Sequence, residues 1–317
     1  MNSYAADLTS VREAASRLDG FAHRTPVMTC RTIDRLSNLE LFFKCENFQK
    51  VGAFKFRGAY NAIAKLSSEQ ADQGVLTHSS GNHAQAVALA ARIRGIKAFV
   101  VMPSTASPVK RQAVEQYGAQ VITCEPTLDS RETTAAKVQE ETGATFIAPY
   151  NNPDVIAGQG TVALELMEEI PALDAVVAPV GGGGLISGIC ATIIGISPST
   201  KVIAAEPVGA DDAARSKAAD KLMPQTSPDT IADGLLTSLG DLTWPFVRNA
   251  VEQVITVTDD EIVRAMRLLW QRAKLLVEPS SAVALAAVLH PTFQEFNFSR
   301  VGVVLTGGNV DIDNLPW

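Results

Sequence analysis

The sequence contains little cysteine or histidine. Each occurs only 4 times among 317 residues, and neither set has the spacing of zinc ligands. The cysteines are Cys30, Cys45, Cys124 and Cys190. Thiols this far apart are typical of buried, reduced residues in a cytoplasmic protein. We therefore expect no zinc site.

Long apolar runs and an excess of positive charge are also missing. No apolar run approaches the roughly 20 residues that cross a bilayer, and the first residues lack the basic-then-apolar pattern of a secretory signal. The formal net charge of −7 argues against nucleic acid or an anionic membrane as the main partner. We expect a cytoplasmic protein with a small-molecule substrate and no nucleic-acid or membrane partner.

Short β-branched runs alternate with helical patterns along the chain. The runs in the first block are residues 75–78, 98–102, 120–123 and 145–147, and those in the second are 175–180, 202–205, 254–257 and 301–305. Strand-helix-strand alternation predicts parallel sheets covered by helices on both faces. The sequence therefore predicts an α/β protein with two doubly wound open-sheet domains and a cleft between them. Ligands of such sheets bind at the carboxyl ends of the strands.

The first stretch with chemical potential contains Lys55, which follows a strand-like run at residues 41–44. Its neighbours include Phe54, Phe56 and two glycines. Burial among such residues lowers the pKa of a lysine and frees its lone pair for Schiff-base formation. From the spacing alone, an ordinary surface cation remains the alternative.

A second stretch, residues 79–84, lies between a predicted strand and a helix of small residues. It supplies the hydroxyls of Ser79 and Ser80 and the amide of Asn82, followed by His83. Together with the free N–H groups of a helix start, they can hold a carboxylate or a phosphate. The alternative is a plain helix cap.

Four consecutive glycines follow the predicted strand at residues 175–180. They are Gly181, Gly182, Gly183 and Gly184. Such a loop can turn its N–H groups inward onto a phosphate. The spacing matches neither a dinucleotide loop nor a Walker loop, so we predict a cradle for a phosphate monoester, with a flexible loop as the alternative.

A fourth stretch, Leu305 to Asn309, again follows a strand, and Thr306 there offers a hydroxyl to a ring nitrogen. Taken alone it is a simple turn. Together, an amine and two anion cradles at strand ends favour a shared site.

Together these four stretches resemble the serine/threonine dehydratase group of pyridoxal-phosphate enzymes, which have a tryptophan-synthase-β-like fold. The resemblance covers nearly the whole chain. It implies that Lys55, next to Phe54, binds pyridoxal 5′-phosphate as a Schiff base and that residues 181–184 bind its phosphate. It further implies that Asn82 contacts the ring hydroxyl and Thr306 the ring nitrogen. The implied division is a large cofactor-binding domain, residues 1–73 and 148–317, and a small mobile domain, residues 74–147.

The same resemblance implies how an amino-acid substrate is bound. Its carboxylate would be surrounded by Ser79, Ser80, Asn82 and His83, and Arg131 would close on it. The alternative for Arg131 is a solvated helix cation.

Within the group, the chain is most similar to the serine racemase branch. Ser80 stands where bacterial threonine dehydratases usually have alanine, and Ala53 replaces a serine common in the family. The resemblance places Ser80 as a second acid opposite Lys55, which implies interconversion of L- and D-serine, with pyruvate and ammonia as side products. The alternatives are a dehydratase of L-serine, L-threonine or threo-3-hydroxyaspartate, and a non-catalytic pyridoxal-phosphate carrier.

The resemblance also implies two further ligands and a homodimer. Mg²⁺, Mn²⁺ or Ca²⁺ would be bound by Glu206, Asp212 and the carbonyl of Ala210, which fits the preference of these cations for oxygen. ATP would bind as an allosteric effector. Its residues would be His23, Lys50, Val51, Tyr117 and Asn309.

Overall fold

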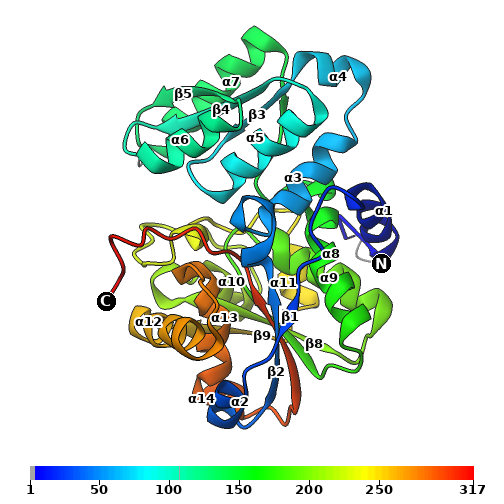
Figure 1. Cartoon of the computed structure of the whole chain (residues 1–317), viewed down its shortest axis with the longest axis vertical. Coiled ribbons are helices and arrows are strands. Elements are labelled where there is room, and N and C mark those ends of the chain that lie inside the picture. Colours follow the sequence, from blue (N-terminus) through cyan, green and yellow to red (C-terminus); the bar gives the residue numbers. More distant parts are fainter. Residues whose placement is uncertain (1–3, 107) are drawn as a thin grey trace.

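A computed structural model of the chain describes residues 4–106 and 108–317 and contains two separate β-sheets. The six-stranded sheet has the order β1-β2-β10-β7-β8-β9, and the four-stranded sheet has the order β5-β4-β3-β6. Every neighbouring pair is parallel except β1 with β2. The prediction of two parallel, helix-covered sheets is confirmed (Figure 1).

The strands agree closely with the predicted runs. Those of the large sheet are β1 (Val27–Met28), β2 (Glu40–Cys45), β10 (Arg300–Leu305), β7 (Ala175–Pro179), β8 (Lys201–Pro207) and β9 (Gln253–Val257). Those of the small sheet are β5 (Gln120–Cys124), β4 (Ala98–Pro103), β3 (Val75–His78) and β6 (Thr145–Phe146). Because β2 pairs with β10, the large sheet joins both ends of the chain. We propose that each sheet is the core of one domain, with boundaries at residues 74 and 147.

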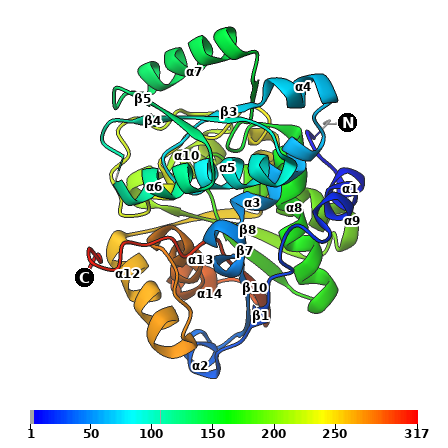
Figure 2. The same ribbon diagram turned by 45° about the horizontal axis from the view of Figure 1, so that its top comes forward.

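Helices cover both faces of both sheets (Figure 2). One face of the large sheet carries α1 (Leu8–Leu18), α8 (Pro153–Glu169), α9 (Gly184–Ile196), α10 (Asp212–Ala219) and α11 (Trp244–Asn249). The other carries α2 (Arg31–Ser37), α12 (Asp259–Leu268), α13 (Pro279–Leu289) and α14 (Pro291–Gln294). In the small sheet, α5 (Asn82–Arg94) and α6 (Pro108–Gln116) lie opposite α7 (Leu128–Thr142). Among the described residues, no helix combines the length and apolar character needed to cross a membrane.

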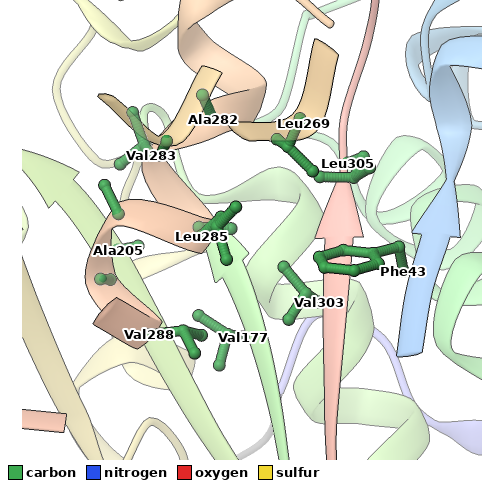
Figure 3. Packing of buried hydrophobic residues seen from close by; sticks show 14 of the residues in the cluster. Phe43, Val177, Ala205, Leu269, Ala282, Val283, Leu285, Val288, Val303 and Leu305 are labelled. Atoms are coloured by element: carbon green, nitrogen blue, oxygen red, sulfur yellow. The ribbon is translucent and has the colours of Figure 1, made fainter. Parts of the chain in front are cut away.

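Alternating side chains of the central strands build a separate core on each face of the large sheet. Val177 and Val303 pack with α13, whereas Val176 and Val304 pack with α8 and α9. Figure 3 shows the first of these cores, with Leu285 of α13 lying over the strands. A strand buried on both faces must be apolar throughout, which explains the continuous apolar runs in the sequence.

The helix α3 (Lys55–Ala64) lies between the two sheets and packs against both α5 and α8. Its contact with α8 is very close. A Cβ at Gly58 would lie 2.8 Å from the carbonyl oxygen of Val155, and a Cβ at Gly158 would lie 2.6 Å from the Cα of Gly58. Only glycine fits at both positions, so these two glycines fix how α3 sits on the large domain. The short α4 (Ser68–Gln73) then leads into the small sheet.

A largely buried cluster of charges anchors α3 from the other side. The Arg57 guanidinium donates to both carboxylate oxygens of Glu46, at 2.8 and 2.9 Å, and to both of Glu165, at 2.6 and 2.8 Å. The Lys44 ammonium donates to Glu165 at 2.6 Å. Arg57, Lys44 and Glu46 have no exposed surface. Two cations therefore balance two carboxylates, which is how such charges are tolerated in a protein interior.

Removing one partner of this cluster should destabilise the protein strongly. We expect Arg57→Met to lower the free energy of unfolding by about 3–5 kcal/mol, because it leaves Glu46 charged and buried without a cation. Chemical denaturation of the variant and the parent measures this difference. The matched control is Arg24→Met, since the Arg24–Glu168 pair is more than half exposed and should contribute less than about 1 kcal/mol. Equal losses in the two variants would contradict the assignment.

Candidate active site

The four predicted stretches all follow the carboxyl end of a strand. Lys55 begins α3 after β2, Asn82 begins α5 after β3, Gly184 begins α9 after β7, and Thr306 follows β10. In open parallel sheets this edge is where ligands bind. The described contacts then join these stretches to one another.

The Lys55 amine lies in a water-poor position. Its Nζ donates to the carbonyl oxygen of Pro149 at 2.9 Å and lies 5.2 Å from the ring centre of Phe54. Burial lowers the pKa of Lys55 to about 8, an effect that the nearby Glu278 carboxyl partly opposes. Near neutral pH a useful fraction of this amine is therefore unprotonated and nucleophilic.

Thr306 is fixed beside Lys55 by the backbone. The N–H of Phe54 donates to the Thr306 carbonyl at 3.0 Å, and Ala53 forms an isolated antiparallel bridge with Gly307. Thr306 itself is only 5% exposed. The predicted ring-nitrogen partner and the predicted amine thus lie on adjoining backbone segments.

Asn82 makes two side-chain hydrogen bonds that cross from the small domain to the large one. Its Nδ2 donates to Glu278 Oε1 at 2.8 Å, and its Oδ1 accepts from Asn309 Nδ2 at 2.8 Å. The same Asn309 nitrogen donates to the Val51 carbonyl at 2.7 Å. The orientation of the Asn82 amide is therefore fixed by two residues of the large domain.

Glu278 is a site residue that sequence reasoning missed. Burial raises the pKa of its carboxyl to about 8, and the charge of Asp233 adds to the effect. In the sequence it stands before Pro279 at a helix start, where an acidic residue is typical of an ordinary cap. Only the fold reveals its contact with Asn82.

The glycine loop, residues 181–184, is too tightly packed for any other residue. A Cβ on Gly182 would lie 2.3 Å from the Tyr150 ring, and one on Gly184 would lie 2.8 Å from Tyr150 Cβ. Gly183 has φ +87°, a conformation that favours glycine. The loop opens α9, whose first N–H groups have no acceptor within the helix. This geometry is suited to a phosphate.

The crossover between the domains forms another part of the site that was not predicted. It runs from Ile147 to Asn152, between β6 and α8. Its Pro149 carbonyl accepts from Lys55, its Tyr150 ring covers the glycine loop, and Asn151 accepts from the N–H of Leu242 at 3.0 Å. Backbone acceptors of this kind leave no signature in a sequence.

Ser79 and Ser80 are half-buried at the end of β3, directly before α5. The Ser79 hydroxyl accepts from the N–H of Gly81 at 3.4 Å. The next side chain, His83, is 2% exposed, and its Nε2 lies 3.0 Å from the Ile147 carbonyl oxygen. The hydroxyl loop, Ser79 and Ser80, therefore adjoins Asn82 and is placed to receive an anion.

Arg131 lies on α7, close to His78 at the end of β3. Its charge contributes to lowering the pKa of His78, although burial of that imidazole is the larger cause. Its Nε is buried and, within the described part of the chain, has no hydrogen-bond partner. The structure thus places it near the residue that precedes Ser79, without a hydrogen bond to the serines.

An ion pair joins α6 to the segment that packs on the glycine loop. Lys110 of α6, in the small domain, lies 2.7 Å from Asp233 in the large domain. Asp233 begins the turn Asp233–Leu235, and a Cβ on Gly181 would lie 3.0 Å from Leu235 Cα. The small domain is therefore linked to the segment that packs on the glycine loop.

Glu206 and Asp212 form a buried acidic pair at the end of β8. Burial raises the pKa of Glu206 to about 8 and that of Asp212 to about 6. Glu206 accepts from two backbone N–H groups of α10, and Asp212 Oδ2 accepts from Leu239 N at 2.9 Å. Asp212 Oδ1 is buried and has no partner among the described residues. Ala210, the third predicted ligand, is also buried.

The residues predicted to bind ATP divide into two places. His23, Lys50, Val51 and Asn309 lie near the start of α3. Asn309 bonds Val51, and the His23 N–H donates to Gln49, the residue before Lys50. Tyr117 instead lines a surface cavity of about 310 Å³ with Arg92 at the far end of α5.

Comparisons with known proteins agree along almost the full chain. A family model described as pyridoxal-phosphate dependent enzyme matches residues 18–307. The beta-hydroxyaspartate dehydratase of Paracoccus denitrificans is 54% identical over 96% of each chain. The serine racemase of Arabidopsis thaliana is 52% identical over 98% of this chain and 96% of that protein. The structure of maize serine racemase matches with a TM-score of 0.97 and 51% identity, over 98% of this chain and 95% of that one.

The lowered pKa of Lys55 can be tested in the cofactor-free protein. We expect its rate of reaction with pyridoxal phosphate to rise with a midpoint near pH 8, because only the unprotonated amine attacks. Stopped-flow absorbance at several pH values measures the rate. Lys55→Met is the control and should lack this phase. A midpoint near the ~10.4 of an exposed lysine would contradict the buried environment.

Proposed function

Because the chain belongs to the family of pyridoxal-phosphate dependent enzymes, we propose that it interconverts L- and D-serine and also dehydrates serine to pyruvate and ammonia. The observation that carries this proposal is the desolvated Lys55 amine at the carboxyl end of the large sheet together with the Ser79–Ser80 loop at the carboxyl end of β3 in the small sheet, which the contacts of Asn82 join to the large sheet. Serine racemases similar over nearly the whole chain support it.

The residues at the sheet edge fit pyridoxal 5′-phosphate. Lys55 supplies the amine for its aldehyde, with Phe54 alongside, and the glycine loop at the start of α9 supplies N–H groups for its phosphate. We propose that Asn82 contacts the ring hydroxyl and Thr306 the ring nitrogen. When bound, the cofactor withdraws electrons from the substrate and so makes its α-proton acidic.

We propose that two residues of the chain move the proton. As a free amine, Lys55 would be the base that takes the α-proton on its side. Ser80 returns a proton from the opposite side, which inverts the α-carbon. Without that return, loss of the β-hydroxyl leads to pyruvate and ammonia. Ser79, Ser80 and Asn82, with the N–H groups that open α5, hold the substrate carboxylate, and Arg131 closes behind them.

A neutral group at the ring nitrogen sets how strongly the cofactor withdraws electrons. The Thr306 hydroxyl should not keep that nitrogen protonated as a carboxylate would. We propose that the weaker withdrawal favours elimination and racemisation over transamination.

A dehydratase of a hydroxy-amino acid is the second candidate function. The similarity to the Paracoccus denitrificans beta-hydroxyaspartate dehydratase favours it. In that case Ser80 would bind the carboxylate only, and no D-serine would form. A carrier that merely binds pyridoxal phosphate has no use for the hydroxyl loop.

Incubation of the cofactor-loaded protein with L-serine distinguishes these functions when D-serine and pyruvate are quantified together. We expect both products from the parent, and we expect Ser80→Ala to lose D-serine formation while retaining some pyruvate, because the second acid is gone. The matched variant is Ser79→Ala, which should slow both products alike through weaker carboxylate binding. Pyruvate without D-serine from the parent would establish the dehydratase instead. D-Serine from Ser80→Ala would disprove the role of Ser80.

We further propose a divalent cation, Mg²⁺, Mn²⁺ or Ca²⁺, bound by Glu206, Asp212 and the Ala210 carbonyl. The buried Asp212 Oδ1 without a described partner supports it. Among residues 4–106 and 108–317, no three histidine, cysteine or acidic side chains are grouped as metal ligands, so a third ligand must come from the backbone. Oxygen ligands of this kind suit hard cations.

ATP as an effector and a homodimer complete the proposal. ATP would bind at Lys50, Val51 and Asn309, with His23 beside it; Tyr117 lines a separate surface cavity and would reach the ATP only across the dimer interface. The bond from Asn309 to Asn82 would connect the ATP site to the active site. A dimer is supported by the exposed apolar side chains of Phe48 and Leu276, which lie close together because Asn47, next to Phe48, donates to the Leu276 carbonyl.

The free, buried cysteines support a location in the reducing cytoplasm.

Thermal unfolding with and without Mg²⁺ tests the cation site. We expect saturating Mg²⁺ to raise the unfolding midpoint of the parent by about 3–5 °C, because a ligand bound only to the folded state stabilises it. Asp212→Asn should abolish this shift. The control Asp211→Asn should keep it, since Asp211 pairs with Arg215 instead. If Mg²⁺ does not raise the unfolding midpoint of the parent, the proposed cation site is contradicted. If ATP then gives no further rise, the proposed role of ATP as an effector is contradicted.

A further inference from the structure

The His83 imidazole has a fixed tautomer. Its Nε2 lies 3.0 Å from the Ile147 carbonyl oxygen, which can only accept a hydrogen bond, so Nε2 carries a proton. Burial lowers the pKa of His83 to about 3, and the neighbouring charges of Lys55 and His78 act in the same direction. The ring is therefore neutral, and Nδ1 has a lone pair and no proton. Within the described part of the chain, Nδ1 has no hydrogen-bond partner.

A neutral ring in this tautomer cannot donate to a carboxylate. Its one N–H is used by Ile147, and a bare Nδ1 would repel an anionic oxygen rather than bind it. The side chain of His83 therefore does not suit the substrate-carboxylate role that the sequence predicts for it. Ser79, Ser80 and the N–H groups at the start of α5 remain for that task.

The carbonyl that His83 holds lies two residues before the one that holds Lys55. Ile147 accepts from His83 and also from the Thr77 hydroxyl at 2.9 Å, and Pro149 accepts from Lys55 Nζ at 2.9 Å. The next residue, Tyr150, packs on the glycine loop. The position of the crossover therefore determines where the Pro149 carbonyl meets the Lys55 amine. It also determines where Tyr150 packs on the predicted phosphate cradle.

We propose that His83 is a positioning residue, whose Nε2–H holds the crossover segment at Ile147 and thereby places the Pro149 carbonyl against the Lys55 amine. The inference rests on the proposed use of Lys55 as the base. A positioning residue needs an N–H at the place of Nε2, whereas a carboxylate ligand would need one at the place of Nδ1. This difference can be measured.

Two amide substitutions separate the nitrogens. The glutamine of His83→Gln places an N–H near the position of Nε2, whereas the asparagine of His83→Asn places one near Nδ1. For the turnover of L-serine, we expect His83→Gln to lose less than about threefold in kcat. We expect His83→Asn to lose about ten- to a hundredfold in kcat, with KM changed by less than about threefold, because a displaced catalytic group mainly slows the chemical step.

The opposite ranking would overturn the proposal. A carboxylate ligand predicts that His83→Asn resembles the parent and that His83→Gln raises KM. Equal losses in both variants would also overturn it, provided that both retain the unfolding midpoint of the parent.

Nitrogen-15 NMR of the histidine-labelled parent gives a reading that depends on neither variant nor turnover. We expect His83 to be neutral and protonated at Nε2 across about pH 6–8, a range in which ordinary histidines titrate. A proton on Nδ1 would contradict the proposal even if the variants fail to fold. If the parent does not turn over serine but shows this tautomer, the proposed function fails and the assignment of His83 does not.

Discussion

The hydrogen bond from Lys55 to the Pro149 carbonyl joins the two parts of the chain on which the site depends. Lys55 opens α3, the helix that lies between the domains, and Pro149 belongs to the crossover from the small domain to the large one. The bond keeps the lysine amine in a water-poor position, where burial lowers its pKa. A carbonyl oxygen accepts from the amine without adding a negative charge that would restore the proton.

The surrounding structure fixes both ends of this bond. On one side, Arg57 holds α3 through the carboxylates of Glu46 and Glu165, and Gly58 allows the helix to approach α8 closely. On the other side, Ile147 is held by Thr77 and His83, and Tyr150 lies against glycines that tolerate no Cβ. Rigid support of this kind is what a catalytic amine requires, because small displacements slow the chemical step. The polar contacts of Asn82 then join the small domain to the same edge.

Much of this arrangement could be predicted from the sequence. Apolar runs marked the strands because strands buried on both faces must be apolar. Lys55, Asn82, residues 181–184 and Thr306 were predicted as parts of one site because each follows a strand. Glu278 and Pro149 could not be found in this way. One looks like a helix cap, and the other acts through a backbone carbonyl, which every residue type has. The pairing of β2 with β10 also depends on contacts between distant parts of the chain.

The proposed chemistry depends on one interaction, the binding of the cofactor by Lys55 and by no other amine. The direct measurement is reduction of the pyridoxal-phosphate-loaded protein with borohydride at neutral pH, followed by digestion and mass spectrometry of every lysine-containing peptide. We expect one stoichiometric adduct on Lys55, loss of that adduct when L-serine is added before reduction, and no adduct in its place in Lys55→Met. An adduct on another lysine, or no specific adduct, would contradict it.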